Sequence, residues 1–442
     1  MDYGLDVDDA RSDGQASAKC KRIVIANFSS RSARNELRYY KMSGTKVFLF
    51  LTILLTPLYV IRFHIGVYPS TLLEILIGLT ILSWVAEAGI KGIKGLKDST
   101  APIALFLVAA TVSVAVSPDK RGALGIFKAY FVEPVLIYLV IKDVVRSKRD
   151  WRLVFTALGL SGLWVALLAV FQGLTGWLTF APHEATLGRA HAVYNTANAV
   201  GLYLGPIIFL LLGSLPGLKG IRGLKGIKEV AAMGGVGLLV LAILLSKSAG
   251  AVVGLTAALL VPIAYCLLPR KWLVGVGRVV GVVTMVVGIW FFFNISSITP
   301  KYIDPYVRKS QDTLQFRLCL WEGSRNLLLD HPVFGAGLSG FKELYSQKYF
   351  TCDAEPLEYP HNWILNFWTE TGILGLLGFL GILGLYFRRV GKVARVERGM
   401  GVAFAAALVY WLIHGLVDVP YFKNDLALEF WVIVGLLKTF RV

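Results

Sequence analysis

A series of apolar runs, each about 20 residues long, constrains this fold more than any other feature. A helix of that length matches the hydrocarbon core of a bilayer, which is about 30 Å thick. In lipid the backbone of each run must satisfy its own hydrogen bonds, and a helix does so. We therefore predict an all-α polytopic membrane protein. Its spans, about twelve in number, are expected at 47–63, 70–88, 101–116, 125–141, 153–172, 194–214, 230–246, 249–268, 278–294, 361–386, 401–417 and 425–440.

The charge pattern gives this topology a direction. Of the 442 residues, 56% are hydrophobic, and the net charge is +17. Alternate connections between the spans, together with the two tails, hold 31 of the 45 Lys and Arg residues. Basic residues gather on the cytoplasmic side of membrane proteins. We therefore expect both termini to be cytoplasmic in a multi-pass protein of the inner membrane, with membrane lipid and no nucleic acid as a partner.

Two parts of unequal size are expected along the chain. Residues 1–45 are polar, show no secretory signal pattern and form a partly disordered cytoplasmic tail. Residues 46–442 form a single transmembrane domain, which includes a large external loop at 295–360 between spans nine and ten. This loop is the longest polar segment between spans, so it is where external chemistry is expected.

Helical spacing continues into the external loop. Arg317, Trp321 and Arg325 stand at i, i+4 and i+8 in a helix expected over 310–329, and they share one face. The glycines of FGAGLSGF then end this helix in a turn. The segment 342–360 has mixed charge, and we predict a mobile loop there. Cys319 and Cys352 both fall outside the membrane, where they are either bridged or two free thiols.

His361 is the sharpest candidate for chemistry. It stands where the external loop meets span ten, next to Asn362. The unperturbed pKa of histidine, roughly 6.5, suits proton transfer near neutral pH, and an asparagine can orient an imidazole or bind a sugar hydroxyl. The alternative is a His–Asn pair that only satisfies backbone donors at a helix start.

The external cations form a second candidate set. Arg189, Lys247, Arg317 and Arg325 lie at or near the outer ends of spans, on the face where positive charge is depleted. Arginine forks match phosphate oxygens in pairs, so converging cations suit a diphosphate. Asn198, at the start of span six, is expected to line the same cavity. Each cation could instead be an interfacial anchor, and we favour that interpretation for Arg325.

Other chemistries lack a motif. The six histidines show no metal-ligand spacing, and the chain has no phosphate-binding loop or nucleophile elbow. GAGLSG at 335–340 follows no strand and is interpreted as a turn. We therefore expect neither a metal nor a cofactor.

Five blocks resemble the bacterial O-antigen ligase and O-antigen polymerase superfamily. The segment from Arg189 to Leu204 is similar to its arginine–asparagine start of a span, and SKSAGAVVG to its Ser-Arg-Gly-Ala turn. In that turn Ala249 replaces the usual arginine, and Lys247 is the candidate to supply the charge. The most specific blocks are FRLCLWEGSRNLLLDHPVFGAGLSGF, PHNWILNFWTETGILGLLGFL and HGLVDVPYFKNDLALEFWVIVGL.

This resemblance implies a membrane glycosyltransferase of the C type that needs no metal. Its donor would be a glycan on a polyprenyl diphosphate, and its acceptor a hydroxyl of a glycan or lipid-linked glycan. His361 would deprotonate or orient that hydroxyl, and Arg317 would bind the diphosphate. The expected substrate-binding residues are Arg189, Lys247, Asn198, Trp321 and Asn362. A flippase or transporter of lipid-linked glycan, or a protein O-oligosaccharyltransferase, is the alternative.

Overall fold

The computed structural model describes residues 43–66, 68–94, 101–214, 227–269, 283, 286–298, 313–350 and 357–441. The predicted tail at 1–45 therefore lies almost entirely outside the described residues. Helices make up nearly all of the described secondary structure. Those that overlap the predicted spans are α2 (Gly44–Leu54), α3 (Leu72–Lys94), α4 (Ala101–Val116), α5 (Lys120–Ile126) with η3 (Phe127–Val132) and α6 (Glu133–Val144), α7 (Lys148–Thr175), α9 (Asn198–Ser214), α10 (Ile227–Leu245), α11 (Ala249–Leu267), the helix Val286–Ile298, α15 (Trp363–Val396), α16 (Arg398–His414) and α17 (Asn424–Thr439).

Length and hydropathy identify membrane spans among the described residues. Four helices there are long and apolar enough to cross a bilayer: Lys120–Val144, Lys148–Thr175, Ala249–Leu267 and Trp363–Val396. Shorter apolar helices of 10–17 residues accompany them, α9 and α16 among them. The chain is therefore an α-helical membrane protein, whereas the number of spans, twelve, stays a prediction.

The first predicted span, 47–63, is wrong at its C-terminal end. Helix α2 stops at Leu54, and Thr56–Val60 form the 3₁₀ helix η1, with Pro57 in its first turn. Strand β1 (Arg62–Ile65) then pairs antiparallel with β2 (Tyr68–Thr71). Proline has no N–H to continue the α-helical hydrogen bonds, so the chain leaves the helix there. The all-α expectation fails at this small hairpin.

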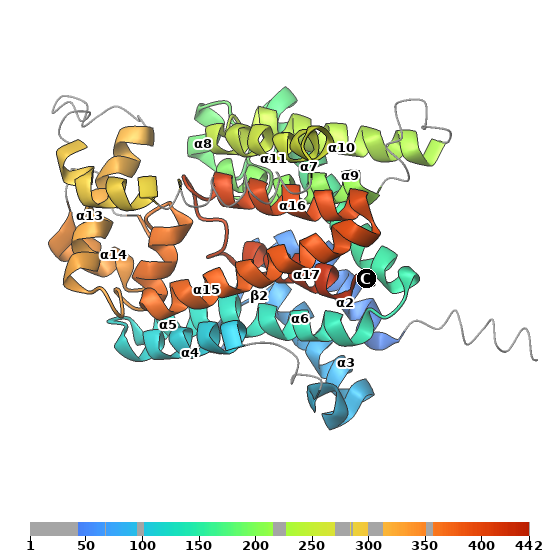
Figure 1. Ribbon diagram of the computed structural model, residues 1–442, viewed down its shortest axis with the longest axis horizontal. Helices are drawn as coiled ribbons and strands as arrows, with labels where there is room; N and C mark the ends of the chain where they lie inside the picture. Colours follow the sequence, from blue (N-terminus) through green and yellow to red (C-terminus); the bar gives the residue numbers. More distant parts are fainter. Residues whose placement is uncertain are drawn as a thin grey trace, which may run out of the picture.

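The helices lie roughly parallel in layers (Figure 1). Helices α4, α5 and α6 run along one side, α7, α9, α10 and α11 along the other, and α15, α16 and α17 lie between them. In this arrangement α15 packs on α4 and α16, α16 packs on α9 and α11, and α17 packs on α6. The last three helices therefore hold the two sides together.

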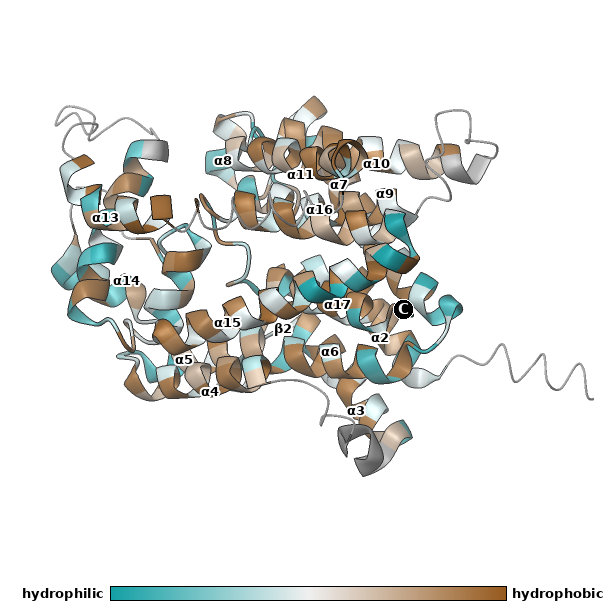
Figure 2. Ribbon diagram, in the orientation of Figure 1, coloured by the Kyte–Doolittle hydropathy of each residue, from teal (hydrophilic) through white to brown (hydrophobic). Residues whose placement is uncertain are grey.

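The polar insert between Ile298 and Trp363 forms a separate unit at one end of the bundle. It contains α13 (Thr313–Asp330), α14 (Phe341–Leu344) and the π-helix η6 (Tyr345–Tyr349). Figure 2 shows hydrophilic segments gathered there, while the bundle helices are mostly apolar. The insert has its own small core, made by Leu320, Leu327, Leu328, Ala336, Phe341, Tyr345 and Tyr349.

The prediction of a mobile loop over 342–360 is wrong for its first part. Residues 341–349 are helical, and Tyr345 is fully buried against α13. Two aromatic residues four positions apart supply the apolar face that the mixed charge of this segment concealed. The predicted helix at 310–329 is confirmed, with its last residue at Asp330.

A turn at 331–340 locks the insert onto α15, as the glycine-rich sequence predicts. Ala336 N donates to Thr369 O at 2.7 Å, and Ser339 N donates to the buried Glu370 Oε2 at 2.7 Å. Helix α15 is interrupted at Gly372, whose φ is +67°. A Cβ on Gly372 would stand 2.2 Å from the Val333 carbonyl oxygen, so only glycine allows this approach.

Close packing of α9 on α16 gives a test of the bundle. A Cβ on Gly205 would lie 1.9 Å from the Tyr410 ring, whereas a Cβ on Gly234 in α10 meets nothing within 4 Å. Small residues let membrane helices approach in this way. Gly205→Ala should therefore destabilise the protein by about 1–3 kcal/mol, although alanine favours helix by about 1 kcal/mol. Gly234→Ala should be neutral or stabilising; equal melting temperatures of the two variants would contradict this packing.

The cysteines of the insert give a second test. Cys319 on α13 is disulfide-bonded, whereas Cys266 is a free thiol. Cys352, the other cysteine of the insert, lies outside the described residues. We expect peptide mapping of unreduced protein to find Cys319 joined to Cys352, and Cys352→Ser to free one additional thiol. Full alkylation of both cysteines without reductant would contradict the bridge.

Candidate functional site

His361 and Asp418 form the centre of the site. His361 precedes α15, and Asp418 lies in the connection 415–423 between α16 and α17. The Nδ1 atom of His361 is 3.2 Å from Asp418 Oδ1; the side chains of the two residues are 27% and 6% exposed. The carboxylate is therefore buried while the imidazole reaches the surface. A carboxylate that accepts from Nδ1–H fixes the tautomer in which Nε2 carries the lone pair.

Asp418 is held in its ionised form. Burial by itself would raise the pKa of this carboxyl group, but the hydrogen bond from His361 and the charges of His361, His414 and Lys423 outweigh it and lower the pKa. The backbone N–H of Val419 also donates to Oδ1 at 2.8 Å. A carboxylate that stays ionised can hold the imidazole in one orientation and stabilise it when it becomes protonated.

The connection that carries Asp418 is pinned to the start of α15. Trp363 N donates to Gly415 O at 2.8 Å, and Asn362 Nδ2 donates to Leu416 O at 3.0 Å. The other side-chain atom of Asn362, Oδ1, accepts from Ile364 N and Leu365 N as the N-cap of α15. Asn362 thus fulfils the capping alternative, and a contact of Asn362 with substrate stays a prediction.

The backbone at His361 is unusual. Its φ is +52°, in the left-handed region that non-glycine residues rarely adopt. Such a conformation costs about 1–2 kcal/mol and persists where the surroundings impose it. Here Asn362 must cap α15 while the preceding side chain reaches Asp418. The strained residue is therefore the one with the partly exposed imidazole.

A hydrogen-bonded chain extends from Asp418 to two predicted residues. Asn198 Nδ2 donates to Asp418 Oδ2 at 2.8 Å, and Arg189 Nη2 donates to Asn198 Oδ1 at 2.7 Å. Arg189 also pairs with the buried Glu184 at 3.0 Å and donates through Nε to Ser246 O at 3.0 Å. The structure thus joins Arg189, Asn198 and His361, which stand far apart in the sequence.

Arg317 lies close to this chain but outside it. Desolvation lowers the pKa of its guanidinium, Arg189 lowers it further, and Asp418 opposes the change. The charged groups near Arg317 are therefore Asp418 and Arg189, which belong to this series of hydrogen bonds. Within the described residues Arg317 makes no hydrogen bond or ion pair. Anion binding by this desolvated guanidinium, which has no hydrogen-bonded partner among the described residues, stays a prediction.

Trp321 and Lys247 lie at the edge of the site. Trp321 Nε1 donates to Pro360 O at 2.9 Å, directly before His361, so it supports the loop that carries the imidazole. The exposed Lys247 follows Ser246, which Arg189 contacts, and its Nζ is 3.4 Å from Leu187 O. Trp321 therefore contacts the residue before His361, and Lys247 follows a residue that Arg189 contacts. Their binding of substrate stays a prediction.

Two other polar residues have structural partners. His191 is fully buried, its Nδ1 lies 2.9 Å from Tyr194 O, and Ala181 N donates to its Nε2 at 3.4 Å. Arg325 Nε donates to Phe292 O at 3.0 Å, which ties α13 to the helix Val286–Ile298. Arg325 is thus an internal tie, which differs from the interfacial anchor that the sequence favoured.

Asp418 and Glu184 are the residues that the sequence did not single out. An acidic residue in a short connection between helices, as in HGLVDVPYF, resembles an ordinary surface residue until its partners are known. The same holds for Glu184 in the segment 173–193. Among the described residues no group of three His, Cys, Asp or Glu side chains is placed to hold a metal ion.

Fold and site together define a class. The protein is a multi-pass α-helical membrane protein with a polar, partly buried site beside a helical insert at one end of its bundle. Residues 234–380, about one third of the chain, match the model of the family described as O-Antigen ligase. This match confirms the resemblance to the O-antigen ligase and polymerase superfamily. A comparison with characterised proteins gave no significant match.

The matched region contains only part of the site. Lys247, Arg317, Trp321, His361 and Asn362 lie within 234–380, whereas Arg189, Asn198 and Asp418 lie outside it. The hydrogen bonds around Asp418 therefore join the matched region to helices that flank it.

The lowered pKa of Asp418 predicts a pH dependence of stability. Because the folded pKa is below the unfolded value of about 4, the stabilisation is present above pH 4 and is lost as pH falls toward the folded pKa. Asp418→Asn should lower stability by about 3 kcal/mol at pH 7, and less at pH 3.5. The melting temperature of purified protein, read from tryptophan fluorescence at both pH values, measures this difference.

Asp330→Asn serves as the matched control. Asp330 pairs with Lys348 on the exposed surface of the insert, so its removal should change the melting temperature little. An Asp418→Asn effect of the same size at both pH values would contradict the ionised, paired state of Asp418.

Proposed function

We propose that this protein transfers a glycan from a polyprenyl diphosphate to an acceptor hydroxyl, as an O-antigen ligase or polysaccharide polymerase does. The observation that carries the proposal is the buried Asp418 beside the partly exposed His361, at 3.2 Å. A carboxylate–imidazole pair of this kind is suited to take a proton from a hydroxyl group. The family match over 234–380 supports the same reaction class.

The reaction assigns one step to each partner. Nε2 of His361 accepts the proton of the acceptor hydroxyl while the hydroxyl oxygen attacks the anomeric carbon of the donor sugar. The bond between that carbon and the diphosphate oxygen breaks, and the lipid diphosphate leaves with the electron pair. Asp418 balances the positive charge on the imidazolium. A new glycosidic bond and a protonated His361 result, and the proton then passes to solvent.

The cations of the site stabilise the negative charge that grows on the diphosphate. Arg317 has no partner of its own within the described residues and is desolvated, so an anion beside it interacts strongly. Arg189 supports the same region through its bond to Asn198, and Lys247 stands at the adjacent turn. These side chains supply the positive charge that a metal ion supplies elsewhere, and we propose transfer without a metal.

We further propose the membrane arrangement that this reaction needs. The chain would cross the inner membrane twelve times in a C-type glycosyltransferase architecture, with both termini in the cytoplasm and 46–442 as one domain. The insert would then face the side where lipid-linked glycans are presented. In Figure 1 the C-terminus lies away from the insert, toward the other end of the helices, which is consistent with this orientation.

The acceptor class distinguishes the related reactions. A glycan or lipid-linked glycan acceptor makes the protein a ligase or polymerase, and a protein acceptor makes it an O-oligosaccharyltransferase. A flippase would instead move the donor without forming a bond. The partly exposed imidazole beside a buried carboxylate favours bond formation over transport.

Purified protein in liposomes, supplied with a lipid-diphosphate glycan and candidate acceptors, tests the proposal. His361→Ala should lower the transfer rate by about 10²- to 10⁴-fold, and Arg317→Ala by about 10²- to 10³-fold. Arg317→Lys should recover part of the loss, because it keeps the charge but not the fork. Mass spectrometry of the products measures the new glycosidic bond.

His183→Ala is the matched control for His361. His183 is an exposed histidine of α8 (Pro182–Thr186), and its side chain takes no part in the chain of contacts. Its removal should leave transfer unchanged. Unchanged transfer by both His361→Ala and Arg317→Ala would refute the site, and donor movement across the bilayer without a new bond would favour the flippase.

A further inference from the structure

A cavity of about 800 Å³ opens at the other end of the bundle from His361. Its walls come from the first half of α7, the facing ends of α9 and α10, and the C-terminal residues 439–441. We call it the basal cavity. The lining residues used below are Lys148, Trp151, Arg152, Leu160, Gly235 and Phe440.

Helix α7 fixes the distance between this cavity and the candidate site. Arg152 lines the cavity, and Gln172, twenty residues further along α7, accepts hydrogen bonds from His191 N and Ala192 N beside Arg189. At 1.5 Å per residue these positions are about 30 Å apart, which is the thickness of a bilayer core. The basal cavity and the His361 site therefore lie at opposite membrane boundaries.

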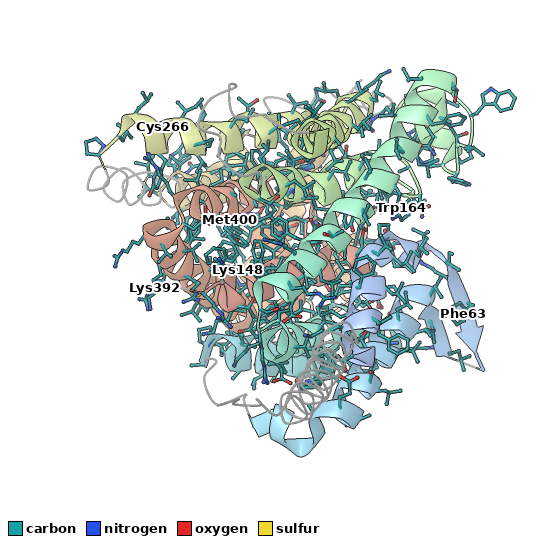
Figure 3. All side chains as sticks on the ribbon, turned by 90° about the vertical axis from the view of Figure 1, so that its right-hand side faces the viewer. Phe63, Lys148, Trp164, Cys266, Lys392 and Met400 are labelled. Atoms are coloured by element: carbon teal, nitrogen blue, oxygen red, sulfur yellow. The ribbon has the colours of Figure 1, made fainter. Side chains whose placement is uncertain are left out.

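The rim of the cavity is cationic. Lys148 and Arg152 are exposed, and neither makes a hydrogen bond or an ion pair within the described residues. Arg146 is already paired with Asp143, and Glu397 is the acidic residue of the lining. Figure 3 looks at this end of the molecule, with Lys148 of α7 near its centre and Met400, another lining residue, beside it.

The interior of the cavity is apolar and aromatic. Trp151 stacks on Phe155 with ring centroids 4.3 Å apart, and Phe440 meets Trp151 edge-on at 5.5 Å. Leu160 is 43% exposed, and a Cβ on Gly235 would meet nothing within 4 Å. Apolar side chains thus border empty space in the same cavity that Lys148 and Arg152 line.

We propose that the basal cavity binds one anionic glycerophospholipid of the surrounding membrane. Lys148 and Arg152 bind its phosphate, and an acyl chain fills the space between α7 and α10. The cationic rim of the cavity matches the anionic head group of such a lipid, and its apolar interior matches the hydrocarbon chain. A free phosphate would leave the apolar part empty, and a zwitterionic lipid would bring a positive amine close to both cations. Bound lipid would join α7, α10 and the C-terminal residues at this boundary.

Native mass spectrometry of the detergent-solubilised protein tests this proposal. The protein is titrated with phosphatidylglycerol or, separately, with phosphatidylethanolamine. Wild type should retain one phosphatidylglycerol with clear preference. Lys148→Ala combined with Arg152→Ala should weaken retention by roughly 10- to 30-fold, since each surface cation contributes on the order of 1 kcal/mol. Gly235→Phe should weaken it as well, because the ring fills the chain space while both cations remain.

Lys392→Ala combined with Arg395→Ala is the matched control. It removes the same charge from exposed residues of α15 near the same end, outside the cavity lining, and should retain lipid as wild type does. Equal loss in this control, equal retention of the two lipids by wild type, or displacement by inorganic phosphate alone would overturn the proposal. So would stronger retention of a polyprenyl phosphate than of phosphatidylglycerol.

Discussion

The buried carboxylate of Asp418 is the group on which the candidate site depends. Its two oxygens contact His361, which lies two residues before the start of α15, and Asn198, the first residue of α9. A buried charge is tolerated only when paired, and removing a partner from such a pair costs several kcal/mol. The requirement to neutralise one carboxylate therefore brings two helix starts together at one end of the bundle. Arg189 joins the same group because it satisfies the remaining acceptor of Asn198.

Aromatic packing next to Asp418 fixes the positions of these side chains. Tyr421, three residues after Asp418, donates to Tyr130 O and packs on Phe106 and Phe379, which belong to α4 and α15. The insert is fixed to the same helices by its turn on Gly372. Side chains held by a rigid aromatic core keep their relative positions, as the catalytic role that we propose for His361 and Asp418 requires. Residues 331–349 of the insert are thus fixed to α15 and α13, and mobility is not needed there to explain their polarity.

The sequence predicted the elements better than their partners. Hydropathy located the long helices, since the length of an apolar run measures the bilayer directly. It failed at Thr56–Val60, because apolar composition continues through a proline-containing turn and into a strand. It also failed at Tyr345 and Tyr349, where a short apolar face was hidden among charges. Asp418 was missed for another reason: a carboxylate shows its role only through partners that are distant in sequence, and periodicity does not measure such contacts.

Arg317 shows why a site of this kind can be incomplete in the free protein. Its guanidinium is desolvated, and Arg189 adds repulsion to that cost. The field of Asp418 opposes both effects, and among the described residues no direct ion pair accompanies it. A carboxylate beside Arg317 would stabilise the folded protein, but it would compete with the diphosphate that we propose as substrate. A substrate diphosphate would supply the negative charge that no described residue places beside Arg317. The interaction would then strengthen as negative charge develops on the leaving group.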